Sequence, residues 1–290
     1  MSKQNAYEKV TARMIEAMGE GTVPWKKMWT SAGCPVSYHG HEYRGINALV
    51  LGFTAFERGY QSNVWVTFNQ VKKAGGRLVD AKGKGVHVIL WKRCEKKDEP
   101  GEFFLYATTF VVFNFDHVEG IDCPKRVSPL QSTHTPDERA DALVAGYAGA
   151  PKIAHSVKHN PCYVPSKDTV RMPAPECFTA SNEYYSTLFH ELTHSTGSES
   201  RLGREGITGE ISFGSDRYSK EELIAELGAA ILCSVAGVEN STTWNNSAAY
   251  LRNWHRKLKE DPKLLVQAAS QAQKAVDHIV GNAFEIQEAA

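Results

Sequence analysis

His190-Glu191-Leu192-Thr193-His194 is the stretch of this 290-residue sequence that decides the fold of its second half. Residues four apart on an α-helix lie on one face, so the two histidines can bind the same divalent metal ion. Glu191 then lies beside the metal, where it can accept a proton from a bound water molecule as a general base. The pentapeptide therefore predicts a helix that carries a catalytic metal site.

A third ligand is expected from a later helix, because a catalytic zinc commonly has three protein ligands and one open position. Apolar residues at helical spacing predict this helix over 219–236, with one buried face made of Leu223, Ile224, Leu227, Ala230 and Ile231. Glu222 and Glu226 border that face, and buried carboxylates are costly unless a positive group meets them. We expect Glu222 to be the third ligand and Glu226 to hold a ligand histidine by its other ring nitrogen.

Two points of this site stay open. The roles of Glu222 and Glu226 can be exchanged, whereas Glu221 is expected to point to solvent, where its charge suits the start of a helix. Tyr184, Tyr185 and Tyr218 are candidate donors to a developing oxyanion, although tyrosines at helical spacing are more often packed in the core. The expected cofactor is Zn²⁺ or another divalent metal such as Mn²⁺.

The composition is that of an ordinary water-soluble protein, with 42% hydrophobic and 23% charged residues. The apolar runs are too short to cross a bilayer and the N-terminus has no signal-peptide pattern, so no membrane partner is expected. The six cysteines form no Cys-x-x-Cys pair, which favours a reducing cytoplasm as the location. Residues 1–128 hold 18 Lys and Arg against 13 Asp and Glu, about +5. A basic first half favours an anionic partner, although a solvated basic face is an equally good reading.

The pattern predicts an α+β protein of two domains. Residues 125–138 are rich in Pro, Ser and Thr and are the expected linker, between a domain at 1–124 and a mainly helical domain at 139–290. In the first domain we expect helices over 4–19, 44–56 and 68–74 and an antiparallel pair over 86–91 and 102–114, joined by a charged tip. In the second we expect helices over 137–148, 181–195, 219–236, 247–258 and 262–279, with a strand pair over 163–172.

Several motifs together resemble ArdC-type antirestriction proteins. In the second half these are residues 190–197, Arg201-Leu202, Phe213-Gly214-Ser215, Tyr218 and residues 221–227. In the first half they are Val23-Pro24-Trp25, Tyr43-Arg44-Gly45-Ile46-Asn47, Trp65-Val66-Thr67-Phe68 and Gly83-Lys84-Gly85. The resemblance covers nearly the whole chain in the same order. One departure is Ser195, where relatives often have tryptophan, which puts the substrate pocket in doubt but not metal binding.

The resemblance implies an N-terminal domain that binds single-stranded DNA and a C-terminal zincin-like metallopeptidase domain. Proteins of this kind are carried on conjugative plasmids and protect incoming DNA from host restriction. The first domain has the mixture of aromatic and cationic residues that single strands need. The candidate DNA contacts are Trp25, Lys26, Lys27, Arg44, Asn47, Trp65, Lys82 and Lys84. The aromatics also suit the core of any α+β domain, Asn47 also suits a helix cap, and Gly83 also suits a plain turn.

Three functions are compatible with these features. The first is a DNA-binding antirestriction protein with an active metallopeptidase domain that acts on a protein substrate. The second is a non-enzymatic protein that coats single-stranded DNA and has a structural or vestigial metal site. The third is a metalloprotease whose basic domain recognises a protein target. An intact Glu191 favours activity, since a structural site would need the histidines but not the base.

Overall fold

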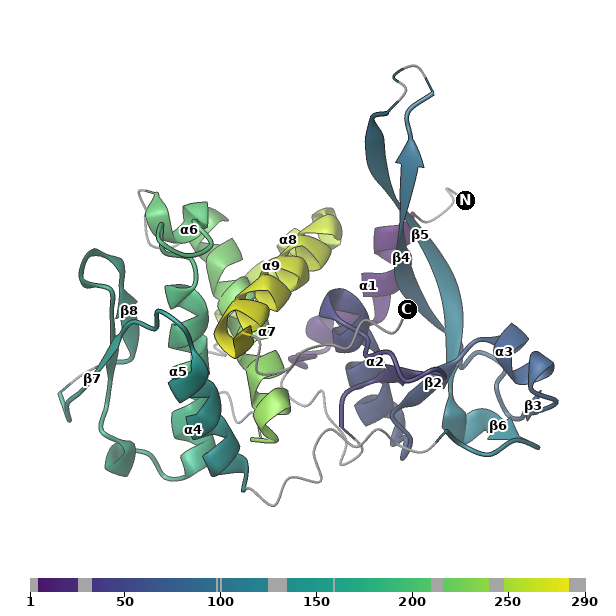
Figure 1. Cartoon of the computed structure of the whole chain (residues 1–290), viewed down its shortest axis with the longest axis horizontal. Coiled ribbons are helices and arrows are strands. Elements are labelled where there is room, and N and C mark those ends of the chain that lie inside the picture. Colours follow the sequence, from purple (N-terminus) through teal and green to yellow (C-terminus); the bar gives the residue numbers. More distant parts are fainter. Residues whose placement is uncertain are drawn as a thin grey trace. The chain divides into compact units, whose positions relative to one another are not determined.

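The computed structural model describes residues 5–25, 33–97, 99, 101–124, 135–158, 160–209, 216–239 and 248–281, with the backbone alone for 216–217 and 248–250. The chain forms two compact units (Figure 1). The first unit contains residues 1–22, 28–129 and 255–266, and the second contains residues 23–27, 130–254 and 267–290. The main division falls within the expected linker, but each unit also takes a short segment from outside the range expected for it.

The first unit is an α+β structure. Its helical elements are α1 (Ala6–Gly19), α2 (Gly45–Arg58), α3 (Phe68–Lys73) and the 3₁₀ turn η1 (Phe115–His117). Its strands are β1 (Val36–Ser37), β2 (Val64–Val66), β3 (Arg77–Leu78), β4 (Val86–Glu95), β5 (Phe103–Asn114) and β6 (Val118–Glu119). One sheet has the order β1-β2-β5-β4, in which only the β1–β2 pair is parallel, and β3 pairs with β6 in a second sheet.

The helix α1 illustrates how local sequence builds this unit. Asn5 and Glu8 form a capping box at its start, which satisfies amide groups that have no partner within the helix. Val10, Met14 and Met18 are buried along one face, at the spacing that predicts the helix from the sequence.

The hairpin β4–β5 is longer than the sequence predicts. Its residues pair without interruption from Val86 opposite Val112 to Glu95 opposite Phe103. The expected charged tip at 92–101 was therefore wrong in its first half, because residues 92–95 continue the strand. The reason is the opposing strand, where three aromatic residues and Leu105 offer a partner to each of them.

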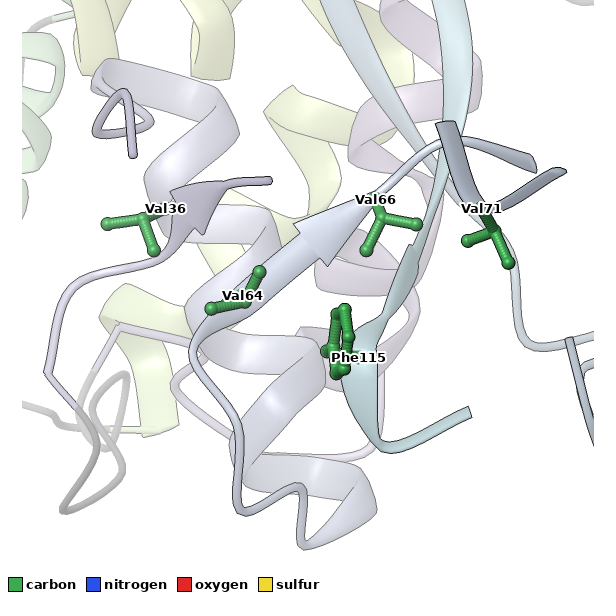
Figure 2. Close-up of a cluster of buried hydrophobic side chains, with 5 residues drawn as sticks. All are labelled: Val36, Val64, Val66, Val71 and Phe115. Atoms are coloured by element: carbon green, nitrogen blue, oxygen red, sulfur yellow. The ribbon is translucent and has the colours of Figure 1, made fainter. Parts of the chain in front are cut away.

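A small core lies beneath the junction of β2 and β5. It consists of Val36, Val64, Val66, Val71 and Phe115, which come from β1, β2, α3 and η1 (Figure 2). Val64 and Val66 share one face of β2, and Trp65 between them is buried on the other face, so this strand is covered on both sides.

The second unit places helices next to a small sheet. Its helical elements are α4 (Pro136–Gly146), η2 (Pro165–Lys167), η3 (Pro175–Cys177), α5 (Ser181–Ser195), α6 (Glu205–Thr208), α7 (Asp216–Ala236) and most of α8 (Ala248–Glu260) and α9 (Lys263–Val280). Its strands are β7 (Lys152–His155), β8 (Cys162–Val164) and β9 (Thr169–Met172), in the order β7-β9-β8. The helices expected from sequence are confirmed to within a few residues, whereas β7, which pairs in parallel with β9, was not expected.

Helices α5 and α7 pack against each other, and this contact positions the residues of the candidate site. Gly228 of α7 lies where a Cβ atom would come within 2.5 Å of Thr193 Cγ2 on α5. Only a glycine allows this approach without a shift of the helices. Among the described residues, no helix is both long enough and apolar enough to cross a membrane.

Asn47 provides a test of the fold of the first unit. Its side chain accepts a bond from the amide of Ile89 at 2.8 Å and donates to the carbonyl of Ile89 at 2.9 Å, which joins α2 to the outer edge of β4. Asn47→Ala removes both bonds and leaves strand groups without partners, so we expect a loss of about 1–3 kcal/mol in the free energy of unfolding. Urea denaturation measures this loss.

The matched control is Asn69→Ala, the same change at an exposed position of α3. It should change the free energy of unfolding by less than about 0.5 kcal/mol. Equal effects of the two substitutions would contradict a structural role for Asn47.

Candidate metal centre

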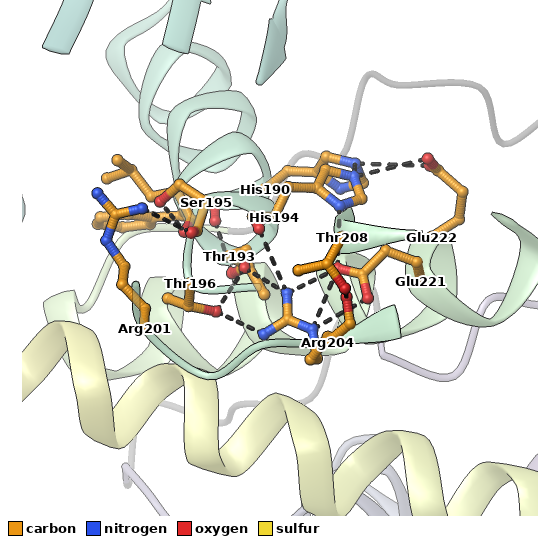
Figure 3. Close-up of polar contacts among 12 residues, drawn as sticks. His190, Thr193, His194, Ser195, Thr196, Arg201, Arg204, Thr208, Glu221 and Glu222 are labelled. Carbon is orange, nitrogen blue, oxygen red and sulfur yellow. Dashed lines mark hydrogen bonds and ion pairs between the residues drawn. The ribbon is translucent and has the colours of Figure 1, made fainter. Parts of the chain in front are cut away.

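Helix α5 brings His190, Glu191 and His194 into the interior of the second unit, where all three are buried. One turn separates the two histidines, so their imidazoles lie side by side with Nε2 atoms 3.1 Å apart (Figure 3). Both Nε2 atoms face Glu222 of α7. Its Oε2 lies 3.6 Å from His190 Nε2, and its Oε1 lies 3.5 Å from His194 Nε2.

These three side chains have the composition and spacing of a metal site. Their ligand atoms all lie within 4.8 Å of one another, and no other group of His, Cys, Asp and Glu in the described part of the chain meets that condition. Two imidazoles and a carboxylate are one of the ligand sets of catalytic zinc. Tetrahedral ligands about 2.0–2.1 Å from zinc are separated by roughly 3.3 Å. The observed separations of 3.1–3.6 Å are close to this value, so the residues fit a divalent metal.

A second carboxylate lies behind each histidine. Glu226 Oε1 is 3.7 Å from His190 Nδ1, and Glu221 Oε1 is 3.3 Å from His194 Nδ1. A carboxylate that accepts from Nδ1 keeps the proton on that nitrogen and leaves the Nε2 lone pair directed at the centre. Glu221 is within hydrogen-bond distance of His194 Nδ1, whereas Glu226 makes a longer ion-pair contact with His190 Nδ1.

Arg204 holds the second of these carboxylates. Its guanidinium is buried and donates to Glu221 Oε1 at 2.6 Å and Oε2 at 3.0 Å. The same group donates to the carbonyl of Thr193 at 2.7 Å and to Thr196 Oγ1 at 2.6 Å, at the C-terminal end of α5. A cation is favourable there because the last carbonyls of a helix lack partners and carry partial negative charge. Figure 3 shows Arg204 between the end of α5 and Glu221.

The expectation that Glu221 points to solvent was wrong, since its side chain is 4% exposed. Helix α7 is buried on almost every side from Glu221 to Cys233, so it has no solvent face at this position. The long run of apolar residues after Glu222 is a signal of this, because a helix that is apolar all round is a buried one. Arg204 was missed as well, because it comes from a loop and no spacing links it to the histidines.

The charges of the centre stabilise one another. Burial alone would lower the pKa of His190, but the neighbouring carboxylates of Glu222, Glu191 and Glu226 outweigh it and raise that pKa to about 9. Burial would raise the pKa of Glu222, but the two histidines and the Tyr218 hydroxyl outweigh it and lower that pKa to about 2. For Glu226 burial dominates and raises its pKa. The centre thus concentrates negative charge in Glu222, beside both Nε2 atoms.

The base expected from the sequence and one of the three candidate tyrosines interact with residues of this centre. The charge of Glu191 acts on His190 and on Cys162 of β8. The Tyr218 hydroxyl bonds to Glu222. Tyr185 donates to Asp141 at 2.8 Å, and the Tyr184 hydroxyl lies 3.0 Å from His155 Nε2. Tyr218 is therefore the candidate tyrosine that contacts a residue of the centre.

Ser195, the departure from the family pattern, lies in the interior. Its hydroxyl donates to the carbonyl of Leu192 at 2.7 Å and lies 3.2 Å from the Tyr147 hydroxyl. Arg201 donates to the Ser195 carbonyl at 2.9 Å and pairs with Asp168 at 2.8 Å. The small side chain therefore leaves room for a polar network at the end of α5.

Several of the expected DNA contacts are occupied by other interactions. Trp25 and Trp65 are both 0% exposed, so neither offers a ring face to a base in this structure. Trp25 belongs to the second unit, where it packs on Trp254 and lies near Glu226. Asn47 is neither a helix cap nor free, because its amide binds Ile89.

The remaining expected contacts are exposed or lie outside the described residues. Arg44 precedes α2 with an exposed side chain, and Lys82 and Lys84 are exposed in the turn before β4. Gly83 adopts a φ of 72° between them, and Lys84 N bonds to Ala81 O at 3.0 Å, which is a β-turn. Lys26 and Lys27 lie outside the described residues.

Comparison with known families also divides the chain into an N-terminal and a C-terminal part. The N-terminal domain of anti-restriction factor ArdC matches residues 4–119, and the zincin-like metallopeptidase family matches residues 138–271. The chain is 32% identical to the DNA primase TraC of Escherichia coli over 98% of its own length, but spans only 27% of TraC. It is 30% identical to protein y4eC of Sinorhizobium fredii (strain NBRC 101917 / NGR234), with 93% of the chain and 90% of y4eC covered.

Two solved structures resemble the whole chain. The Mn(II)-bound crystal structure of the antirestriction ArdC protein from plasmid R388 is 35% identical, with a TM-score of 0.78 and coverage of 98% of this chain and 100% of that one. The metal-free structure of the same protein is 35% identical, with a TM-score of 0.76 and coverage of 97% and 98%. The structural similarity to the R388 protein spans both units, and the 35% sequence identity extends over nearly the whole chain. The chain therefore belongs to the ArdC antirestriction family.

Proposed function

We propose that this chain is an antirestriction protein that binds single-stranded DNA through its first unit and cleaves a peptide bond in its second. In this proposal it protects incoming conjugative plasmid DNA from host restriction. The observation that carries the proposal is the convergence of His190, His194 and Glu222 beside the buried carboxylate of Glu191. A site of purely structural value needs the three ligands but not a buried base next to them.

Each residue of the centre has a distinct proposed role in peptide hydrolysis. His190, His194 and Glu222 would hold a divalent metal, which supplies Lewis acidity toward a peptide carbonyl and toward water. Glu191 accepts a proton from the attacking water and delivers it to the leaving amine. Glu226 and Glu221 keep the imidazoles in the tautomer and orientation that ligation needs.

Zinc is the metal that we propose for this set of residues, because two histidines and a glutamate are a common zinc set. The ArdC protein of plasmid R388 has been crystallised with Mn(II), so manganese is the alternative to test. Both are divalent and accept imidazole and carboxylate ligands.

Binding of single-stranded DNA is supported by the match of the first unit to the ArdC N-terminal domain and by the basic character of residues 1–128. Arg44, Lys82 and Lys84 are exposed there and can neutralise phosphates. TraC is named a DNA primase, which also favours a DNA partner for the segment shared with this chain.

The roles of ligand and base can be separated by substitution. Glu222→Ala should lower metal affinity by more than 100-fold, whereas Glu191→Gln should keep the metal and lose peptidase activity, because it removes only the proton acceptor. Elemental analysis and calorimetric titration with Zn²⁺ and Mn²⁺ measure the first effect. Protection of transferred plasmid DNA measures the second. If Glu191→Gln protects as well as the wild type, the protein acts as a coat for DNA and not as a peptidase.

The role of Arg204 is open to the same kind of test. Arg204→Lys keeps the charge but loses the fork that holds both oxygens of Glu221, so we expect metal affinity to fall roughly 10- to 100-fold. Arg201→Lys is the matched control, since Arg201 binds Asp168 and does not bond to Glu221. Circular dichroism checks that both variants are folded. If the Arg204→Lys and Arg201→Lys variants bind the metal with equal affinity, Arg204 does not position Glu221 for metal binding.

The DNA-binding proposal is tested by its dependence on salt. Wild-type protein should bind a labelled oligothymidine with an affinity that falls as salt rises, because bound phosphates release counterions. Lys82→Gln together with Lys84→Gln should reduce the slope of log K against log salt by about 1.4, or about 0.7 for each lost phosphate contact. Failure of the wild type to bind, or binding that salt does not weaken, would contradict the assignment.

A further inference from the structure

The outer part of the β4–β5 hairpin exposes large apolar side chains on consecutive residues. Those that are 44% exposed or more are Leu90, Trp91, Phe103, Phe104, Leu105 and Tyr106. Figure 1 shows this part of the hairpin extending beyond the other elements of the first unit. A contiguous exposed apolar patch of this kind usually marks an interaction site.

The register of the hairpin sorts these side chains onto two faces, because residues directly opposite each other share a face and successive residues alternate. Lys92 lies opposite Tyr106, and Cys94 lies opposite Phe104. We call this side the Phe104 face; it consists of Leu90, Lys92, Cys94, Phe104, Tyr106 and Thr108. The other side is the Phe103 face; it consists of Trp91, Arg93, Glu95, Phe103, Leu105 and Ala107.

The two faces differ in what they offer a partner. On the Phe103 face, Arg93 lies over the Phe103 ring at 3.9 Å, Trp91 packs near Tyr7 of α1, and Glu95 adds a carboxylate that repels anions. The Phe104 face continues beyond the strands to Lys96 and Glu102, whose side chains form an ion pair with each other at 2.7 Å. Its rings of Phe104 and Tyr106 are 47% and 55% exposed, and Lys92 lies beside Tyr106, on the opposing strand.

Exposed rings next to a lysine, with the neighbouring carboxylate of Glu102 paired to Lys96, match the chemistry of a single strand of nucleic acid, which presents bases and phosphates together. Bases stack on aromatic rings whatever their sequence, and a lysine neutralises the phosphate between them. Side chains two apart on a strand are roughly 6.6–7 Å apart, about twice the 3.4 Å step along one DNA strand. Phe104 and Tyr106 are therefore spaced to receive successive bases of a strand whose own stacking is opened.

We propose that the Phe104 face is a stacking platform for single-stranded DNA, with Phe104 and Tyr106 against bases and Lys92 on a phosphate. This inference rests on the proposed DNA binding of the first unit and names the surface that carries it. Phe104 and Tyr106 thus become the proposed stacking residues. Trp25 and Trp65, which the sequence suggested for this role, have buried rings.

The test is fluorescence anisotropy of the full-length protein with a labelled oligothymidine at two salt concentrations. Phe104→Ala together with Tyr106→Ala should raise Kd by at least about 25-fold, since loss of one stacked base costs roughly 5- to 150-fold. Lys92→Gln should reduce the slope of log K against log salt by about 0.7. The matched control is Phe103→Ala together with Leu105→Ala, which removes similar exposed apolar area from the other face and should leave Kd unchanged.

Each outcome has one meaning. If the wild type binds and the Phe104/Tyr106 variant binds equally well, the platform is wrong while the proposed DNA binding stands. If the wild type itself does not bind, the proposed function fails first. If DNA binding is unchanged but analytical ultracentrifugation shows that this variant converts a dimer to a monomer, the face contacts a second copy of the chain, and the DNA platform is overturned. Equal losses in both pairs of variants would mean that the hairpin is sensitive to any change, and would also overturn a platform on one face.

Discussion

The buried ion pair between Arg204 and Glu221 is the constraint on which the candidate metal centre depends. Each charge is out of water, so neither is tolerated without the other, and removal of one partner from such a pair commonly costs about 3–5 kcal/mol. Because Arg204 also binds the carbonyl end of α5, the pair fixes the end of that helix relative to α7. His194 directly follows Thr193 in α5, and its Nδ1 atom lies 3.3 Å from Glu221 Oε1.

The close approach of α5 and α7 makes this arrangement possible. At Gly228 the two helices lie so near that a methyl group would meet Thr193. The glutamates of α7 come from the turns before Gly228, and the histidines of α5 flank Thr193. Glu222 therefore reaches both imidazoles directly, and the other two carboxylates reach the far side of the rings. Within this enclosed polar cluster, Glu221 is satisfied by Arg204 and His194, whereas the Oε2 atom of Glu226 has no hydrogen-bond partner among the described residues.

In the first unit the aromatic residues fall into two groups with different physical roles. Trp65 is enclosed in the sheet and its neighbours, whereas Phe104 and Tyr106 lie on a hairpin that the rest of the unit does not cover. The sequence does not distinguish the two groups, since aromatic residues of both groups lie near lysines in the chain. Burial separates them, because a ring that is enclosed on all sides stabilises the fold and leaves no face for a base.

Local sequence was sufficient for much of this protein. Periodicity and helix ends predicted α1, α5, α7, α8 and α9, and the spacing of His190 and His194 placed both on one helical face, because these properties depend on neighbours within a few residues. Tertiary structure alone decided that Glu221 is buried against Arg204, that Trp25 lies beside Glu226, and that residues 92–95 continue a strand. Each of these depends on a partner that is eight or more residues away, and no local pattern indicates which distant residue will supply the opposing charge, ring or strand. The sequence therefore determined which residues can do metal chemistry, and packing decided which of them meet.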